Sequence, residues 1–76
     1  MNTGEKIKYY REKKGLTQSA LSRRICCYPS TISMWEKGRY VPTIETISRI
    51  AKVLEINPIL LLPDWFINEA NSYGTP

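Results

Sequence analysis

Apolar positions recur along this 76-residue chain at spacings of three and four, and no segment alternates with a period of two. Glycine and proline divide this helical pattern into short pieces. We therefore expect an all-α protein, a compact five-helix bundle with tight connections. The helices are predicted over residues 3–14, 18–25, 29–37, 44–54 and 58–62.

Residues that favour helix termini flank these segments. Asn2 or Thr3 can accept a hydrogen bond from the free N–H groups that open the first helix, and Thr17 can do so for the second. Pro29 suits the first position of the third helix because its missing N–H has no partner there. The other start and stop signals are Gly15, Gly38, Thr43, Asn57, Pro58 and Pro63.

The apolar residues of each predicted helix fall on one side and form the predicted core. They are Ile7, Tyr10, Leu21, Ile25, Ile32, Trp35, Ile44, Ile47, Ile50, Ala51, Leu54 and 59–62. Arg11 shares the inward side of the first helix, which is unusual because arginine is rarely buried without a partner. The second and third helices are separated by about three residues, the dimensions of a helix-turn-helix unit.

Length and composition exclude several classes of protein. A chain this short forms one domain with little room for an enclosed active site. It has no histidine and two cysteines, so we expect no enzyme, no cofactor and no metal site. The apolar block 59–62 is too short to span a bilayer and no signal peptide is evident, so we expect a cytoplasmic protein without membrane contact.

Charge is distributed unevenly along the chain. Residues 1–40 contain nine Lys or Arg and three Glu, whereas residues 41–76 have a net charge of −2. The first half could therefore face a polyanion. A solvated lysine-rich surface is the alternative.

The third predicted helix has two different faces. Ile32 and Trp35 lie inward, whereas Ser30, Met34 and Lys37 lie outward with Ser33 beside them. The outward face is short, polar and free of carboxylates, as a helix that enters the major groove of DNA requires. An ordinary exposed helix face is the alternative.

The order of these residues resembles that of Cro/C1-type helix-turn-helix proteins, over residues 4–62. It is carried by Gly4-Glu5-Lys6-Ile7, Gly15-Leu16-Thr17-Gln18, Leu21-Ser22, Ser30-Thr31-Ile32-Ser33, Trp35-Glu36-Lys37-Gly38-Arg39 and Pro42-Thr43. The resemblance implies a lambda-repressor-like DNA-binding domain over 1–63. It also implies a transcriptional regulator, a repressor that binds an inverted repeat in double-stranded DNA as a homodimer, without a small-molecule substrate.

The resemblance further implies roles for individual residues. Arg11 and Glu36 would form a buried ion pair between the first and third helices. The expected base-reading residues are Ser30, Ser33 and Met34, with Tyr28 and Thr31 at the edges. The expected phosphate contacts are Thr17, Gln18, Lys37, Arg39 and Tyr40, and for Tyr40 packing is an equal alternative.

The chain departs from the family pattern in the turn before the third helix. Cys26 stands where the family usually has glycine at positive φ, and keeping that geometry costs a side-chain-bearing residue on the order of 1 kcal/mol. Ser22 replaces a more usual alanine, and Tyr28 is large for a helix cap. Cys26 and Cys27 also allow a redox hypothesis, although two half-buried, inert thiols are the alternative.

Residues 64–76 are expected to form a C-terminal extension that ends in a frayed tail. Its apolar residues make it a candidate dimer contact, with packing back on the core as the alternative. The candidate contact residues are Leu62, just before this segment, and Trp65, Phe66 and Ile67 within it. A protein-binding adaptor or antitoxin-like partner with the same fold is the alternative to a repressor.

Overall fold

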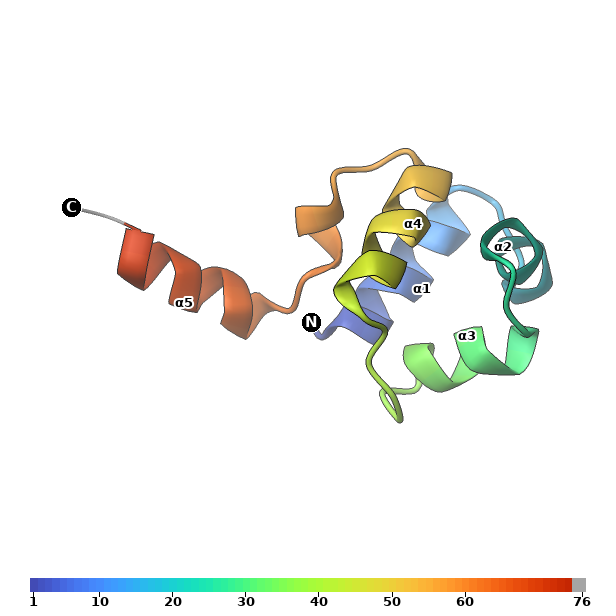
Figure 1. Ribbon diagram of the computed structural model, residues 1–76, viewed down its shortest axis with the longest axis horizontal. Helices are drawn as coiled ribbons and strands as arrows, with labels where there is room; N and C mark the ends of the chain where they lie inside the picture. The colour runs from blue at the N-terminus through green and yellow to red at the C-terminus, as the bar shows by residue number, and fades with distance from the viewer. Residues whose placement is uncertain (75–76) are drawn as a thin grey trace.

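The computed structural model describes residues 1–74, and the side chains of residues 1–69. The elements are α1 (Thr3–Lys13), α2 (Gln18–Ile25), α3 (Pro29–Glu36), α4 (Ile44–Leu54), a 3-10 helix η1 (Pro58–Leu61) and α5 (Asp64–Gly74). The first four helices and η1 gather into a bundle, and α5 extends away from it (Figure 1). The predicted all-α, five-helix class is confirmed.

The helix boundaries follow local capping chemistry. Asn2 and Glu5 form a capping box, in which each side chain accepts a hydrogen bond from the other residue's backbone N–H. Thr17 and Thr43 accept hydrogen bonds from the first turns of α2 and α4. Gly15 follows α1 at φ +81°, which glycine adopts without a Cβ clash.

One apolar core joins α1, α2, α3, α4 and η1. Its buried residues are Ile7, Leu21, Ile25, Ile32, Trp35, Ile47, Ile50, Ala51, Leu54 and Leu61. Tyr10 is only partly buried against it. The prediction was wrong for Ile44, which is 62% exposed. Ile44 is the first residue of α4 and borders a surface groove formed with the preceding loop and α5.

The segment predicted as a fifth helix over 58–62 is a single 3-10 turn. Leu61 is fully buried, whereas Ile59 and Leu60 are 50% and 40% exposed, contrary to the prediction. Pro63 explains the shortness of this turn, because a residue that precedes proline is disfavoured in the α conformation. Leu62 is extended, with ψ of 147°.

The C-terminal segment, predicted as an extension with a frayed end, contains the helix α5 through Gly74. Residues 64–73 contain no proline or glycine to interrupt a helix. Asp64 in its first turn contacts the ammonium groups of Met1 and Lys6, and the hydrogen bond from Lys6 lowers the pKa of Asp64 to about 2. Residues 75–76, part of the expected tail, lie outside the described residues. No helix in the part of the chain that the structure describes is long and apolar enough to cross a membrane.

Two backbone features position α3: a close approach between α1 and the end of α3, and the turn between α2 and α3. Gly4 of α1 is buried, and a Cβ added there would lie 2.0 Å from the carbonyl oxygen of Trp35. The end of α3 can therefore reach α1 only because residue 4 has no side chain.

Gly4→Ala tests this approach. Alanine is favoured over glycine inside a helix by about 1 kcal/mol, but overpacking typically costs about 1–3 kcal/mol and the obstacle here is backbone. We expect urea denaturation to show a loss of about 1–2 kcal/mol. Lys8→Ala, at an exposed position of the same helix, is the control. A Gly4→Ala variant as stable as the control would contradict the close approach.

The second feature is the turn between α2 and α3. Cys26 closes α2 in the left-handed conformation, with φ 60° and ψ 52°, and the N–H of Cys27 donates to the carbonyl oxygen of Ser22 at 3.0 Å. Cys26 thus keeps the positive φ that the family's usual glycine has at this position. Ser22 is buried, and its hydroxyl donates to the Ser19 carbonyl oxygen at 2.8 Å, so serine is accommodated where alanine is usual.

Cys26→Gly should stabilise the protein. The left-handed conformation costs a residue with a Cβ about 1–2 kcal/mol, and the greater freedom of glycine in the unfolded chain cancels part of that gain. We expect a net gain of about 0.5–1 kcal/mol in chemical denaturation. Cys26→Ala removes the thiol but keeps the Cβ, so it should give no gain. Equal stabilisation by both substitutions would show that the thiol, not the backbone, carries the penalty.

Candidate nucleic-acid interface

The exposed face of α3 holds the residues that the sequence singled out for base contacts. Ser30 is exposed, Met34 is 36% exposed, and Thr31 and Ser33 are half-buried at the edges of the face. Tyr28 is 77% exposed and its side chain makes no capping hydrogen bond, which leaves its hydroxyl available to an external partner. The structure thus brings these five residues together on one surface.

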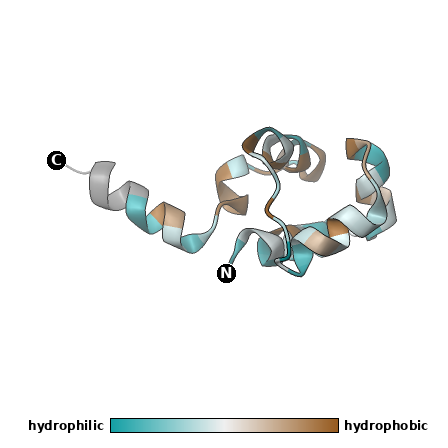
Figure 2. Cartoon of the chain, turned by 60° about the horizontal axis from the view of Figure 1, so that its bottom comes forward, coloured by the Kyte–Doolittle hydropathy of each residue, from teal (hydrophilic) through white to brown (hydrophobic). Residues whose placement is uncertain are grey.

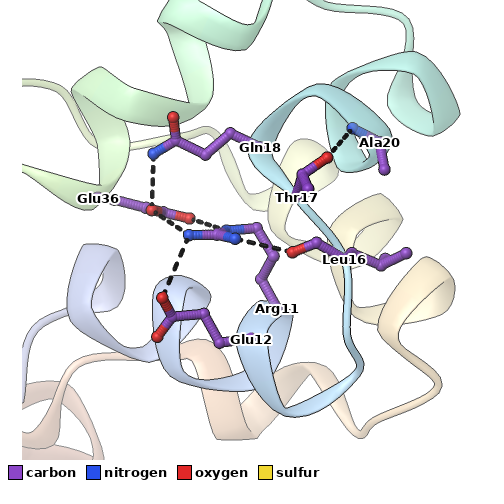
Figure 3. A network of polar contacts seen from close by, with 7 residues as sticks. All are labelled: Arg11, Glu12, Leu16, Thr17, Gln18, Ala20 and Glu36. Carbon is purple, nitrogen blue, oxygen red and sulfur yellow. Dashed lines mark hydrogen bonds and ion pairs between the residues drawn. The ribbon is translucent and has the colours of Figure 1, made fainter.

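The opposite side of α3 is tied to the core by Ile32 and Trp35, and to α1 by an ion pair. Arg11 Nε donates to Glu36 Oε2 at 2.6 Å, and Arg11 Nη2 donates to Glu36 Oε1 at 3.0 Å (Figure 3). The two side chains are 9% and 4% exposed. This is a bidentate arginine–carboxylate pair, the geometry that fixes orientation as well as distance.

Further contacts complete the network around this pair. Arg11 Nη1 donates to the carbonyl oxygen of Leu16 at 2.8 Å, and Gln18 Nε2 donates to Glu36 Oε1 at 3.0 Å (Figure 3). Glu12 lies 3.9 Å from Arg11 at the solvent-facing edge. The hydrogen bond that Arg11 donates to Glu36 raises the pKa of Arg11, so the guanidinium remains charged. One carboxylate therefore joins the ends of α1 and α3 and the start of α2.

The same contact determines the electrostatics of the exposed face. Glu36 is the one acidic residue in the sequence of α3, and its carboxylate is buried against Arg11. The exposed face consequently presents hydroxyls, a thioether and, just beyond it, Lys37, with no carboxylate to repel phosphate. This explains how a helix with an acidic residue can still face a polyanion.

The start of α2 is a second donor surface beside α3. Thr17 Oγ1 accepts from the N–H of Ala20 at 3.0 Å and is thereby occupied as a cap. The side-chain amide nitrogen of Gln18 donates one hydrogen bond to Glu36. The backbone N–H groups of the first turn of α2 supply further donors. Such groups at a helix N-terminus favour anions.

The loop after α3 carries the other expected phosphate contacts. Lys37, Arg39 and Tyr40 are all exposed, and Tyr40 is 64% exposed, so it does not pack into the core. The N–H of Arg39 donates to the carbonyl oxygen of Met34 at 3.0 Å, which holds the loop close to α3. Its cations therefore adjoin the exposed face.

Two contacts of this region were not anticipated from the sequence. Arg49 of α4 donates to the carbonyl oxygen of Ile25 at 2.6 Å and so completes the C-terminal end of α2. Gln18 supports Glu36 rather than standing free. No local pattern signals either one, because the partners are 24 and 18 residues apart.

The two cysteines differ in environment. Cys26 is exposed and Cys27 is half-buried, and neither forms a disulfide. Burial raises the pKa of the Cys27 thiol, which keeps it protonated and weakly nucleophilic at neutral pH. The described residues contain no cluster of three or more potential metal ligands.

The candidate dimer residues separate into two environments. Leu62 packs against the core, whereas Trp65 and Phe66 are 67% and 45% exposed and contact each other edge to face. Trp65 and Phe66 border a groove of about 350 Å³ with Tyr40, Val41 and Ile44. No lining residue of this uncharged groove is acidic or basic. Ile67 is half-buried and borders a different depression, beside α1.

Comparison with known proteins agrees with this architecture. A helix-turn-helix family model matches residues 7–61, most of the chain. The chain belongs to the helix-turn-helix family. The Cro/C1-type resemblance is confirmed, and the family is one of transcriptional regulators.

Related sequences support the assignment. An uncharacterised helix-turn-helix transcriptional regulator of Methanocaldococcus jannaschii is 36% identical over 64 residues, covering 84% of this chain and 91% of its own. The transcriptional regulator DicA of Escherichia coli is 31% identical over 62 residues, covering 82% of this chain and 46% of its own. The chain thus spans nearly all of one relative but less than half of the other.

Solved structures share the fold. The P22 c2 repressor in complex with a synthetic operator superposes with a TM-score of 0.76 at 31% identity, over 82% of this chain and 94% of that one. SinR in complex with DNA superposes with a TM-score of 0.72 at 28% identity, over 78% of this chain and 95% of that one. Hydroxypropylphosphonic acid epoxidase from S. wedmorenis also matches, at 0.75 and 31% identity, but over 80% of this chain and only 32% of the enzyme. The helix-turn-helix fold therefore also occurs as a minor part of an enzyme.

Removing one partner of the buried ion pair should destabilise this helix-turn-helix domain. Arg11→Met strands the Glu36 carboxylate, which typically costs about 3–5 kcal/mol. A domain of this size loses about 4–8 °C per kcal/mol, so the Tm measured by circular dichroism should fall by more than about 10 °C.

Two controls separate loss of pairing from loss of arginine. Lys8→Met, on the exposed side of α1, should leave the Tm nearly unchanged. Arg11→Met combined with Glu36→Leu leaves no stranded charge and should recover part of the loss. An Arg11→Met variant with the same Tm as the wild type would contradict the structural role of the pair.

Proposed function

We propose that this chain is a transcriptional repressor that binds an inverted repeat in double-stranded DNA as a homodimer. The observation that carries the proposal is the exposed face of α3, which has no carboxylate because Glu36 is buried against Arg11. Relatives of the same fold, including the P22 c2 repressor and SinR, are known in complex with DNA.

In this proposal α3 enters the major groove and selects the sequence. Ser30 and Ser33 offer hydroxyls that donate to or accept from base edges, and the Met34 side chain can contact a thymine methyl. Tyr28 and Thr31 flank these residues at the start of the helix. Short side chains allow the close approach that such contacts require.

The phosphate contacts surround this helix. Lys37 and Arg39 supply charge, and Tyr40 a hydroxyl, on the loop after α3. The first turn of α2, at Thr17 and Gln18, supplies backbone N–H groups. These contacts position the protein on the duplex and make its affinity depend on salt.

The uncharged groove is the proposed dimer surface. Val41, Ile44 and Trp65 are each more than 60% exposed there, which is unusual for large apolar side chains of a small monomer. Homodimer interfaces are depleted in charge at their core, as this groove is. A two-fold contact through it would present two copies of α3 to successive major grooves.

Selection from a pool of random duplexes at two salt concentrations tests the DNA-binding proposal. We expect an enriched inverted repeat whose half-sites lie about one helical turn apart, about 10 base pairs. Met34→Ala should relax the preference at one position of each half-site, since a good base contact discriminates by about 1–3 kcal/mol. Lys37→Gln should instead weaken binding to all sequences alike. It should also reduce the slope of log affinity against log salt concentration by about one.

Weak binding with no enriched sequence would contradict the proposed function. In that case the basic half of the chain would be a polyanion surface without sequence preference. If Met34→Ala, like Lys37→Gln, lowered the affinity for every sequence equally, α3 would not be the helix that reads the bases.

Trp65→Ser tests the dimer surface. The indole is mostly exposed in the single chain, so the substitution should leave the Tm nearly unchanged at protein concentrations below the dimer Kd. We expect the dimer Kd measured by analytical ultracentrifugation to rise at least tenfold, about 1.4 kcal/mol. Tyr9→Ser removes an aromatic residue of similar exposure outside this groove and should leave the Kd unchanged. A Trp65→Ser variant that dimerises like the wild type would exclude the groove.

A protein-binding adaptor is the second candidate. Multiprotein-bridging factor 1 of Debaryomyces hansenii is 34% identical over 56 residues, covering 74% of this chain and 37% of its own. An adaptor would retain the fold while failing the DNA selection. A further apolar surface, distinct from the uncharged groove, favours keeping this candidate.

A further inference from the structure

A second apolar groove lies along α1, η1 and the end of α4. One hollow of about 500 Å³ is bordered by Tyr9 and Ile59, and a neighbouring hollow of about 460 Å³ by Leu54 and Ile56. Tyr10 and Leu60 border both hollows, so the two hollows adjoin at these side chains. We call the two together the lysine-flanked groove, after Lys6, Lys13 and Lys14, which also line it.

Large apolar side chains stand exposed along this groove. Tyr9 is 51% exposed, Ile59 50% and Leu60 40%. Figure 2 shows the hydrophobic residues of η1 and those in the first turns of α5 beside it. Contiguous exposed apolar surface of this kind marks sites of protein interaction.

The groove faces away from the proposed DNA surface. Helical spacing places Gly4, Ile7 and Arg11 on the side of α1 that meets the core and α3, whereas Tyr9 and Lys13 lie on the opposite side. η1 contacts α1 and α4. A ligand in this groove would therefore leave the exposed face of α3 free.

Charge distinguishes this groove from the uncharged one. Lys6 lies 2.8 Å from Asp64, and Lys14 lies 3.1 Å from Glu55, so each has one carboxylate partner. Lys13 has no ion pair with any carboxylate of the described residues, and its ammonium lies 5.7 Å from the centroid of the Tyr9 ring. A symmetric contact between two copies through this face would bring like charges together, which opposes self-association.

We propose that the lysine-flanked groove binds an amphipathic acidic helix of a partner protein. Apolar residues spaced by three and four would fill the depression between Tyr9 and Leu60, as in other helix-in-groove complexes. Carboxylates beside them would face Lys13 and the edges of the groove. The proposal does not rest on DNA binding by α3.

A synthetic peptide of about 18 residues provides the probe, long enough to form helix on binding. It carries leucine at positions i, i+3, i+4 and i+7 of each repeat and glutamate on the other faces. A second peptide has the same composition with its leucines scattered. Titration into the ¹⁵N-labelled chain should shift the amides of residues 6–14 and 59–61 saturably. The ordered peptide should bind at least tenfold tighter than the scattered one.

Matched variants test the contacts. Lys13→Glu should raise the peptide Kd at least threefold, and Tyr9→Ser should raise it similarly. Lys8→Glu makes the same charge change at an exposed position of α1 that does not line the groove, and should change the Kd by less than twofold. All three positions are exposed, so we expect each variant to fold. Unchanged amide chemical shifts outside the substituted turn of α1 would verify this.

Three results would overturn the proposal. Equal binding of both peptides would show attraction by charge alone. Amide shifts centred on α2 and α3 would show that the peptide occupies the proposed DNA surface as a polyanion. Tighter binding of a peptide with the sequence of residues 63–76 at the groove would assign it to a second copy of this chain. Failure to bind DNA would change none of these results, so the two proposals fail separately.

Discussion

The bidentate contact between Arg11 and Glu36 is the interaction on which the arrangement of the first three helices depends. Its carboxylate also accepts from Gln18, and its guanidinium also donates to the carbonyl oxygen of Leu16. Taking two charges out of water is costly, and a hydrophobic pair of similar size is often as stable. What the charged pair adds is direction, because two parallel hydrogen bonds fix the angle between α1 and α3. Gly4 then allows the end of α3 to approach α1 at backbone distance.

The Glu36 carboxylate affects both the stability of the fold and the charge of the exposed face of α3. If Glu36 were turned outward, the one acid of α3 would face any phosphate near the helix. Arg11 would then be left buried with only the Leu16 carbonyl oxygen and the more distant Glu12 as partners. Because the pair is formed, the exposed face carries only neutral side chains up to Lys37. The two apolar grooves lie elsewhere on the molecule and differ in charge, so one suits a second copy and the other an acidic partner.

Helix positions could be predicted closely from the sequence because their signals are local. Asn2 and Thr17 mark helix starts through the hydrogen bonds that their side chains accept, and Pro29 does so through its missing N–H. These starts agree with the structure to within a residue. The apolar spacing likewise identified most of the core. The family resemblance, rather than any local pattern, supplied the pairing of Arg11 with Glu36.

The features that were missed depend on contacts between distant segments. Ile44 has the spacing of a core residue, yet it is exposed at the first turn of α4 and borders the uncharged groove. The short turn at η1 follows from two prolines acting together. The chain of α5 runs into Asn71-Ser72-Tyr73-Gly74, a polar sequence typical of a frayed end. Arg49 and Gln18 acquire their partners only when α2, α3 and α4 pack. Sequence periodicity indicates which side of a helix is apolar, but not what lies opposite.

The most direct measurement is an NMR titration of the ¹⁵N-labelled chain with the duplex enriched by selection. We expect the largest amide shifts at residues 28–34 and 37–40 and at the start of α2, with none along the lysine-flanked groove. Intermolecular contacts from Met34 to a thymine methyl would place α3 in the major groove. Shifts centred on α1 and η1, or no saturable change, would contradict the assignment of α3 as the DNA-reading helix.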